Sequence, residues 1–366
     1  MNKVINHIWI PKRILKANGK NLKGGAQRDS ITELIHTSDD VEGIHRIRTR
    51  TGFRYEIQNK PVKDKNVLMR INSLVLPPAW NEVWICPLPN GHLQATGLDQ
   101  KNRKQYRYHT IWMEFRGQSK FDRLYEFGGK LTAIRAQVSK DLAQPDLPKS
   151  KVISSIVSIM EQTTIRIGNT FYEKLYGSFG LSTFHNRHVS IIGTKLRFMF
   201  KGKKGVYHDI SLKSRKLARI IQRCKHIPGK ELFQYLADDG SIHSVESGDV
   251  NRYILDLTQN HFTSKDFRTW AGSVECLEAI RNTQDPEPSS SRRINAVIDQ
   301  VAARLGNTRT VCRKYYIHPI ILKYFEKGKL EHILTTSLEI PEEWSRLTEG
   351  EVSLMKLLKS VKLTRD

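Results

Sequence analysis

The sequence is poor in cysteine and shows no recognisable metal-binding pattern. Its 366 residues include 4 cysteines, Cys86, Cys224, Cys276 and Cys312, which are widely scattered and form no CxxC pair. This scatter argues against a zinc site or a disulfide framework and favours a reducing compartment. The 13 histidines show no HExxH or similar spacing. We therefore expect no metal site.

Long hydrophobic runs are also missing. No stretch approaches the roughly 18 consecutive apolar residues that a membrane-spanning helix needs. The first residues show no clear signal-peptide core or cleavage site. We expect no association with a membrane.

Acidic residues are scarce relative to basic ones. The chain has 60 lysines and arginines against 37 aspartates and glutamates, a formal net charge of +23. Because each neutralised phosphate releases counterions, this excess favours a polyanionic partner. Charge alone does not separate DNA from RNA. Selection for solubility or for a ribosome-like assembly would also account for it.

Patterning divides the chain into three regions and predicts an α+β fold. Residues 1–35 carry glycine and asparagine breakers and predict a flexible basic arm. Residues 36–117 have the signals of a β-rich domain, with Asn90-Gly91 as a two-residue hairpin signal. Residues 118–366 are mainly helical, with a small antiparallel sheet near KLRFMFKGKKGVYHD and a Pro/Ser-rich linker at 282–293.

One stretch with a strand-like pattern, GLDQKNRKQYRYH, interleaves basic and aromatic residues. Tyr106 and Tyr108 fall on one face, and Gln105 and Arg107 on the other. Cations can reach phosphates and amides or phenols can reach base edges, so the strand suits DNA contact. An exposed edge strand protected by charge explains the pattern equally well.

Several cations stand at positions with more than one interpretation. Arg166 falls near the end of a predicted helix, where an arginine usually complements the helix dipole. Lys203 lies at the tip of a predicted hairpin, where a lysine is normally solvated. Lys265 and Arg268 fall in the first turn of a helix capped by Thr263 or Ser264. Cations there oppose the dipole unless an anion binds, which is a mild indication of a phosphate site.

The stretch LGNTRTVCRKYYIHP, residues 305–319, predicts a helix end, a tight turn and a short helix. Gly306 suits a helix C-terminus, and Asn307 or Thr308 can cap the next helix. Tyr315 and Tyr316 follow in a locally basic run. They belong either to an amphipathic helix with half-buried tyrosines or to a nucleophilic site facing a DNA phosphate.

Taken together, these motifs resemble the type IB DNA topoisomerases, specifically the short bacterial and poxvirus-like form. The likeness rests on IRIGN, FKGKKGVYH, KDFRTW and LGNTRTVCRKYYIHP in that order. The segment LPPAWNEVWICPLPNGHLQATGLDQKNRKQYRYH is similar to that family's DNA-contacting β domain. The resemblance covers roughly residues 40–335.

The resemblance implies a role for each catalytic residue type. Tyr316 would attack a backbone phosphate and form a 3′-phosphotyrosyl link, and Arg166 and Arg268 would clamp the non-bridging oxygens. Lys203 would donate a proton to the leaving 5′-oxygen. Supercoils would relax without ATP, metal or any other cofactor.

One position departs from the poxvirus-type pattern. Those members carry a histidine where Asn307 stands, whereas the bacterial forms carry asparagine. Because an amide can donate a hydrogen bond but carries no charge or transferable proton, we expect only an oxyanion contact from Asn307. The match to the family motif favours Tyr316 over Tyr315 as the nucleophile.

The resemblance further implies a C-shaped clamp around double-stranded DNA. The β-rich domain would lie on one side of the duplex and the helical catalytic domain on the other. A monomer without an obligatory protein partner, cytoplasmic and associated with the nucleoid, is expected. The DNA-binding residues would be Lys104, Gln105, Tyr106 and Tyr108, facing the major groove, together with Lys265.

Two other functions remain open from the sequence. A tyrosine recombinase or integrase shares the Arg/Lys/Arg/Tyr chemistry, but usually carries HxxR where this chain has Lys265-Asp266-Phe267-Arg268. A non-catalytic DNA clamp would keep the basic surface without the chemistry. The presence of all the charged and phenolic catalytic residue types argues against it.

Overall fold

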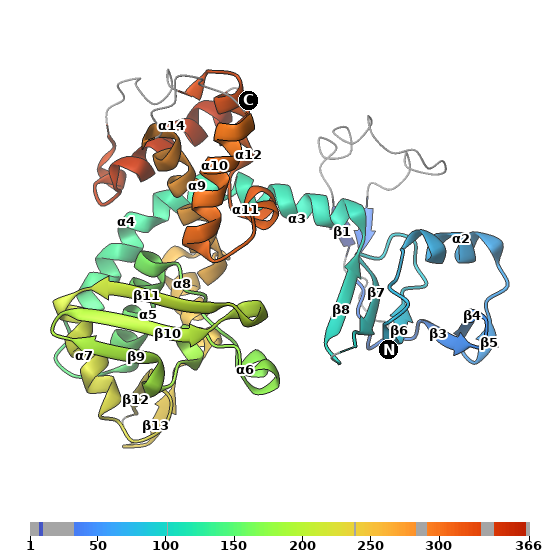
Figure 1. Ribbon diagram of the computed structural model, residues 1–366, viewed down its shortest axis with the longest axis horizontal. Coiled ribbons are helices and arrows are strands. Elements are labelled where there is room, and N and C mark those ends of the chain that lie inside the picture. The colour runs from blue at the N-terminus through green and yellow to red at the C-terminus, as the bar shows by residue number, and fades with distance from the viewer. Residues whose placement is uncertain are drawn as a thin grey trace. The chain divides into compact units, whose positions relative to one another are not determined.

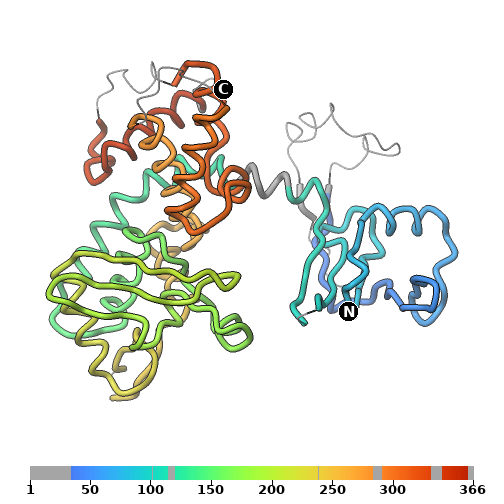
Figure 2. Tube along the Cα trace, viewed as in Figure 1, coloured from blue at the N-terminus to red at the C-terminus, as the bar shows by residue number. Residues whose placement is uncertain are grey.

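The computed structural model divides the chain into two compact units, Met1–Lys120 and Phe121–Asp366 (Figure 2). Helix α3, Thr110–Asp122, runs across the boundary between them. Each unit is described by itself. The structure describes residues 7–9, 33–100, 102–237, 239–282, 291–330 and 340–363.

The smaller unit is built on a six-stranded antiparallel sheet (Figure 1). Helix α2, Lys65–Ser73, begins at Asp64, whose carboxylate accepts from the backbone N–H of Asn66 and Val67. Ile71 of this helix joins Ile44, Val83, Ile85 and Ala95 in the core of the unit. The sheet order is β5 (Lys60–Pro61), β4 (Gly52–Ile57), β3 (Ile44–Thr49), β6 (Asn81–Ile85), β7 (Leu93–Leu98) and β8 (Lys104–Tyr108).

The hairpin predicted at Asn90-Gly91 differs from a two-residue turn. Strands β6 and β7 do pair antiparallel, but the connection between them is longer, because Asn90 and His92 hydrogen-bond to Ile35 instead. The side-chain amide of Gln94 donates to three carbonyls of this loop, those of Leu88, Pro89 and Gly91. Tertiary hydrogen bonds therefore replace the local turn that the dipeptide suggests.

The predicted basic arm, residues 1–35, lies largely outside the described residues. Two short pieces of it are strands: β1, His7–Trp9, pairs antiparallel with β2, Glu33–Ile35. At these residues the arm forms a short antiparallel ladder, in which Ile8 pairs with Leu34 and Trp9 with Glu33. Most of the predicted linker, 282–293, also lies outside the described residues, because these exclude 283–290.

The larger unit is mainly helical. Its three-stranded antiparallel sheet, in the order β11 (Tyr207–Lys213), β10 (Lys195–Lys201), β9 (Val189–Ile192), turns Leu196, Phe198 and Phe200 into the core. A short hairpin, β12 (Gln234–Leu236) with β13 (Ile242–Ser244), stands where only helices were expected. The helices are α4 (Leu124–Asp141), α5 (Lys149–Thr163), α6 (Thr170–Tyr176), α7 (Arg215–Lys225), α8 (Ser247–Thr258), α9 (Ser264–Asn282), α10 (Ser291–Leu305), α11 (Arg309–Tyr315), α12 (Pro319–Glu326) and α14 (Glu349–Leu363).

The last of these helices is tied to the centre of the unit through an ion pair between the buried Glu351 and the half-buried Arg135. Arg135 of α4 contacts Glu351 of α14 at 2.7 Å and Glu161 of α5 at 2.8 Å. The Glu351 carboxylate also accepts from the indole N–H of Trp270 in α9 at 2.9 Å. Removing one partner of such a pair is strongly destabilising, because the other charge stays buried. The network therefore fixes α9, which carries Arg268, against three other helices.

The expected fold class is confirmed: a small β-rich N-terminal part and a larger, mainly helical part with a small antiparallel sheet. The expected clamp stays a prediction. None of the helices in the described ranges combines the length and apolar composition that a membrane span requires.

Candidate active site

The turn between α10 and α11 has the geometry expected from its sequence. Gly306 adopts a left-handed conformation, φ +57°, and the backbone N–H groups of Gly306 and Asn307 donate to the carbonyls of Ala303 and Ala302. This pair of bonds closes a helix C-terminus and reverses the chain. Thr308 then caps α11 through its hydroxyl, which accepts from the N–H of Val311. Tyr316 follows at the C-terminal end of that helix.

Helix α9 packs directly against the backbone of Tyr316. A Cβ on Gly272 would lie 2.9 Å from the carbonyl oxygen of Tyr316 and 3.0 Å from its Cβ, so only glycine allows this approach. The hydroxyl of Ser273, next on the helix, donates to the same carbonyl at 3.2 Å and accepts from the N–H of His318 at 3.0 Å. These contacts hold Tyr316 against a rigid element.

Arg268 is buried beside the Tyr316 ring. It is 5% exposed, and its guanidinium carbon lies 5.3 Å from the ring centroid. Its two terminal nitrogens donate to the backbone carbonyls of Thr164 and Leu305, which lie at the C-terminal ends of α5 and α10. Burial and the neighbouring Arg166 lower its pKa to about 10. A buried guanidinium with little negative charge around it is suited to bind an anion.

The sequence placed both cations of the first turn of α9 against the helix dipole, but the structure shows a local compensation. Asp266 accepts from the N–H of Thr263 at 2.8 Å, forming a capping interaction. Lys265 stays exposed, whereas Arg268 turns inward. The start of α9 therefore gives less indication of a phosphate site than the sequence suggested. The case for Arg268 rests on its burial near Tyr316.

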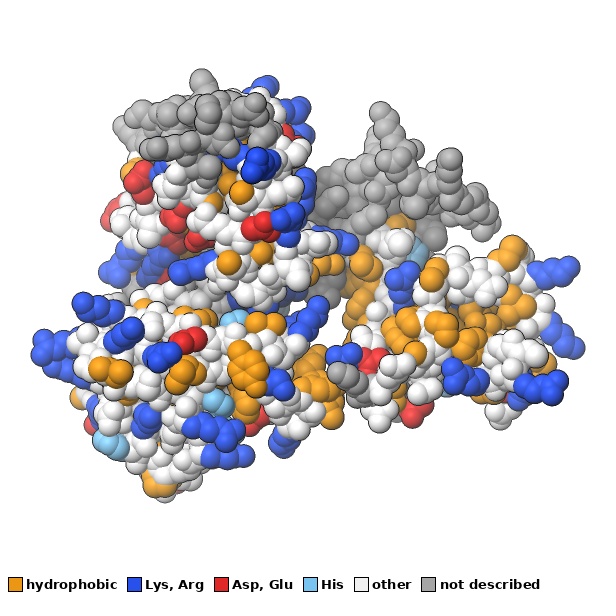
Figure 3. All heavy atoms as spheres, viewed as in Figure 1, with side chains coloured by type: hydrophobic (Ala, Val, Ile, Leu, Met, Phe, Trp, Pro, Cys, Tyr) orange, Lys and Arg blue, Asp and Glu red, His pale blue; other side chains and the backbone are white. Residues whose placement is uncertain are grey.

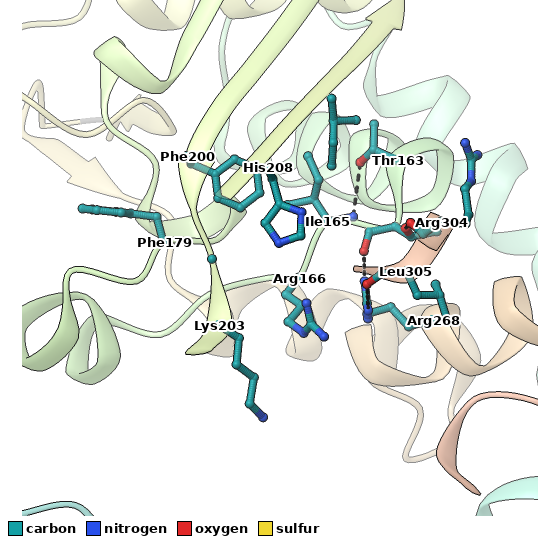
Figure 4. Close-up of a pocket in the computed structure, with 13 residues that line it drawn as sticks. Thr163, Ile165, Arg166, Phe179, Phe200, Lys203, His208, Arg268, Arg304 and Leu305 are labelled. Atoms are coloured by element: carbon teal, nitrogen blue, oxygen red, sulfur yellow. Dashed lines mark hydrogen bonds between the residues drawn. The ribbon is translucent and has the colours of Figure 1, made fainter. Parts of the chain in front are cut away.

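Arg166 lies beyond α5 rather than within it, which corrects the expectation of a position near the helix end. The helix stops at Thr163, because Thr164 is left-handed at φ 58°. The carbonyl of Arg166 accepts from the N–H of Leu181 at 3.0 Å, and a Cβ on Gly180 would lie 2.5 Å from that carbonyl oxygen. The close strand-like packing fixes the backbone, so that the guanidinium projects into the pocket (Figure 4).

Arg166 and Asn307 are in direct contact, a pairing that the sequence did not indicate. A terminal nitrogen of Arg166 donates to Oδ1 of Asn307 at 2.7 Å, and the Asn307 amide nitrogen donates to the carbonyl of Leu305 at 3.3 Å. The amide therefore orients one guanidinium, and the carbonyl of Leu305 is shared with Arg268. The tight turn at Gly306 makes this possible.

Lys203 lies at the tip of the hairpin between β10 and β11, as predicted. Residues Lys203–Gly205 form a single tight turn, and the side chain extends away from the pocket in Figure 4. Desolvation, and then the charge of Arg166, lower the pKa of the Lys203 ammonium. Tyr316 acts in the opposite direction. A lysine that releases its proton more readily suits a general acid.

Burial and positive charge act on the Tyr316 phenol in opposite directions. Burial raises its pKa, but the charges of Arg268 and Arg166, a hydrogen bond with Arg268 and the charge of Lys203 together bring the pKa below 10.0. The cation arrangement therefore favours the phenolate. Tyr315, by contrast, is 41% exposed, and its ring lies 5.5 Å from the Lys314 ammonium.

One residue of the pocket was not singled out from the sequence. His208 of β11 lines the same pocket as Arg166, Lys203 and Arg268. Burial, followed by Arg166 and Arg268, lowers its pKa. A histidine early in an alternating strand carries no local signal of such a position, because only the tertiary packing brings it beside two arginines.

The predicted DNA-contacting residues do not share one face. Tyr106 and Tyr108 stack with ring centroids 6.0 Å apart, and Lys104 lies 5.8 Å from the Tyr106 ring. Gln105 instead donates to Asp99 at 2.9 Å. The strand period of two puts it on the opposite face from the other three, as its sequence position indicates, and the contact of all four residues with one groove stays a prediction.

Lys104 itself is engaged in an ion pair. Its ammonium lies 2.6 Å from Asp39, whose carboxylate also accepts from Thr96. A phosphate contact by Lys104 would therefore compete with Asp39. Among the described residues, no group of three or more His, Cys, Asp or Glu side chains is placed to hold a metal ion.

Comparison with known proteins gives this arrangement a family. Residues 109–335 match the family described as "Eukaryotic DNA topoisomerase I, catalytic core", and residues 52–99 match "Bacterial DNA topoisomerase IB, N-terminal domain". DNA topoisomerase 1B of Acanthamoeba polyphaga mimivirus is 30% identical over 299 residues, which cover 79% of this chain and 89% of the viral protein. DNA topoisomerase 1B of Vaccinia virus (strain Copenhagen) is 23% identical over 294 residues, covering 76% and 89%. The chain belongs to the type IB DNA topoisomerase family and is an isomerase.

Proposed function

We propose that this protein relaxes supercoiled double-stranded DNA by reversible strand cleavage at Tyr316. The phenolate oxygen attacks a backbone phosphorus, a P–O bond to tyrosine forms, and the P–O5′ bond breaks. One strand then carries a 3′-phosphotyrosyl link and a free 5′-hydroxyl. Because the number of phosphoester bonds is unchanged, resealing needs no ATP, and the uncut strand permits rotation in between.

The observation that carries this proposal is the convergence of Arg166 and Arg268 on Tyr316. Both arginines lower the phenol pKa, and Arg268 is buried directly beside the ring. Phosphoryl transfer depends on positioning and on neutralising charge that develops on the phosphate. Two guanidinium groups held by backbone carbonyls and by Asn307 supply both.

Protons balance through two groups. The phenolic proton of Tyr316 leaves to solvent before attack, and the proton of the Lys203 ammonium goes to the departing O5′. In the reverse step the neutral amine takes the proton of the 5′-hydroxyl, and the phenolate leaves. The lowered pKa of Lys203 supports an ammonium that exchanges its proton in this way.

Asn307 acts through its amide. Its oxygen orients Arg166 at 2.7 Å, which leaves the amide N–H group, now donating to Leu305 at 3.3 Å, as the donor for a phosphate oxygen. The proposal keeps the oxyanion contact expected from the sequence and adds an orienting function that the sequence did not indicate.

DNA binding is proposed for Lys104, Tyr106 and Tyr108 of β8 and for Lys265 of α9. Stacked tyrosines, one of them 50% exposed, and flanking cations suit a duplex surface. Lys and Arg side chains are also prominent on the face of the larger unit drawn in Figure 3. The protein would act as a monomer that closes around the duplex as a clamp, without a required protein partner.

Covalent trapping tests the proposal. The protein is mixed with a nicked or suicide duplex and quenched with detergent, and the DNA-linked protein is counted for wild type, Tyr316→Phe and Tyr315→Phe. We expect an adduct on the 3′ end for wild type and Tyr315→Phe, and none for Tyr316→Phe. Both phenylalanine variants are needed, because the two tyrosines fall in one tryptic peptide, YYIHPIILK, so identifying the DNA-linked peptide would not tell them apart. An adduct with Tyr316→Phe would refute the assignment.

A further inference from the structure

His208 is placed between two elements of the proposed site. It is the second residue of β11, and its ring stacks on Phe200 of β10 with centroids 4.9 Å apart and an interplanar angle of 18°. In Figure 4 its ring lies beside Phe200, close to Arg166. The stack fixes the ring plane, and the catalytic roles proposed above make no use of His208.

The ring fills a space left open by two glycines far apart in the sequence. A Cβ on Gly202 would lie 2.7 Å from Cδ2 of His208, and a Cβ on Gly306 would lie 2.5 Å from its Cε1. Both distances are shorter than real Cβ contacts, so each backbone can approach the imidazole only as glycine. Gly202 immediately precedes Lys203, and Gly306 immediately precedes Asn307.

We propose, on the basis of the function above, that His208 is a positioning residue that seats the Lys203 hairpin against the Asn307 turn. Its ring is in contact with both backbones, so the ammonium and the Arg166–Asn307 pair keep a fixed relation to one phosphate. His208 does not itself donate a proton. Its burial, and then the charges of Arg166 and Arg268, lower the pKa of the imidazole. The neutral ring that this favours adds no further positive charge beside the two guanidinium groups.

The proposal predicts which chemical step suffers when the ring is removed. His208→Ala would leave the hairpin without its support, and misplacing a catalytic group by about 1 Å can cost about 10²-fold in rate. The affected group is the general acid Lys203. Departure of a 5′-oxygen needs its proton, whereas a 5′-sulfur leaves as a thiolate, because a thiol has a pKa of only about 8.5.

The experiment measures single-turnover adduct formation on two duplexes that differ only in the leaving atom, 5′-oxygen or 5′-sulfur. We expect His208→Ala to be slower by at least about tenfold on the oxygen duplex and close to wild type on the sulfur duplex. In a Lys203→Ala background, His208→Ala should cause little further loss. This non-additivity would show that both changes remove the same contribution.

Two further variants protect the test from a folding defect. Gly202→Ala introduces the clash from the hairpin side, and its extended backbone, φ −92° and ψ −164°, accepts alanine without strain. It should show the same oxygen-selective loss. His243→Ala is the matched control, since His243 is also a strand histidine stacked on an aromatic ring, Tyr235, at 5.7 Å. It lies outside the pocket and should behave as wild type.

Equal slowing of both duplexes by His208→Ala, or no slowing of either, would overturn the positioning role. So would a further loss of full size in the Lys203→Ala background. If wild type itself forms no adduct on either duplex, the proposed function fails first. Failure of the two ideas is therefore distinguishable.

Discussion

Around Tyr316, the balance between burial and positive charge decides how much phenolate is present near neutral pH. Burial alone would raise the pKa, and the two arginines and Lys203 reverse its sign. Arg268 is the largest of the opposing contributions. Arg268, which is buried beside the ring, is therefore also the largest single cause that lowers the pKa of the phenol.

This balance predicts a shift of the pH–rate profile. A lowered pKa means that the phenolate forms at lower pH, so the cleavage rate should rise with pH and level off below about pH 10, the value for a free phenol. Arg268→Gln should move the rising limb to higher pH and reduce the neutral-pH rate by about 10²–10³-fold. The profile is measured as single-turnover cleavage against pH.

Arg281→Gln is the control for this prediction, because Arg281 lies at the opposite end of α9 and pairs with the exposed Glu349. It should leave the profile unchanged. A rising limb at the same pH in Arg268→Gln and wild type would show that Arg268 does not tune the phenol.

A second prediction at the residue scale concerns a negative charge introduced at position 307. Asn307→Asp keeps the shape and the acceptor for Arg166, but adds a carboxylate where a phosphate should bind. We expect Asn307→Asp to cleave at least about tenfold more slowly than Asn307→Ala, since a like charge near the phosphate costs more than a missing hydrogen bond. Single-turnover cleavage measures both. Equal rates would place Asn307 away from the phosphate.

At the scale of elements, α9 carries Arg268 at one end and supports Tyr316 at Gly272. Gly272→Ala would force the Tyr316 backbone to move by a few tenths of an ångström, since the new Cβ lies 2.9 Å from its carbonyl oxygen. We expect cleavage to fall by about tenfold, while the melting temperature changes little, because helix propensity offsets the strain. Cleavage rate and thermal unfolding are measured on the same preparation.

The matched control is Gly129→Ala in α4, where an added Cβ meets nothing within 4 Å. Alanine should stabilise this helix by up to about 1 kcal/mol and leave cleavage unchanged. If Gly272→Ala cleaves as fast as Gly129→Ala, the close packing of α9 on Tyr316 does not matter for the reaction.

Local rules predicted the elements around the site well. The left-handed Gly306, the cap of α11, the hairpin carrying Lys203 and the apolar stripe of α10 are all as expected. Each depends on residues close together in the chain, where turn, capping and periodicity rules apply. The order of these motifs was enough to indicate the family.

What the sequence did not indicate depends on contacts between distant segments. The contact of His208 with Gly306 joins residues 98 positions apart, the contact of Tyr316 with Gly272 joins residues 44 positions apart, and the pairing of Arg166 with Asn307 joins residues 141 positions apart. Asn90-Gly91 does not form the expected tight turn, because backbone hydrogen bonds with Ile35 hold the loop instead, and the Gln105 amide donates to Asp99. Tertiary packing decides such positions, so local patterns carry little information about them.

At the scale of the whole molecule, the net charge of +23 should dominate affinity for DNA. If binding neutralises some six to ten phosphates, affinity should fall by about 10³–10⁵-fold between 50 and 200 mM salt. Fluorescence anisotropy with a labelled duplex measures this slope. Binding that is nearly independent of salt would contradict the proposed clamp, whose arrangement around the duplex stays a prediction.

The most direct test of the central claim is relaxation of a supercoiled plasmid in excess EDTA without ATP, comparing wild type with Tyr316→Phe. We expect full relaxation by wild type and none by Tyr316→Phe, with Tyr315→Phe active. Binding of wild type to the plasmid without relaxation, or relaxation by Tyr316→Phe, would contradict it.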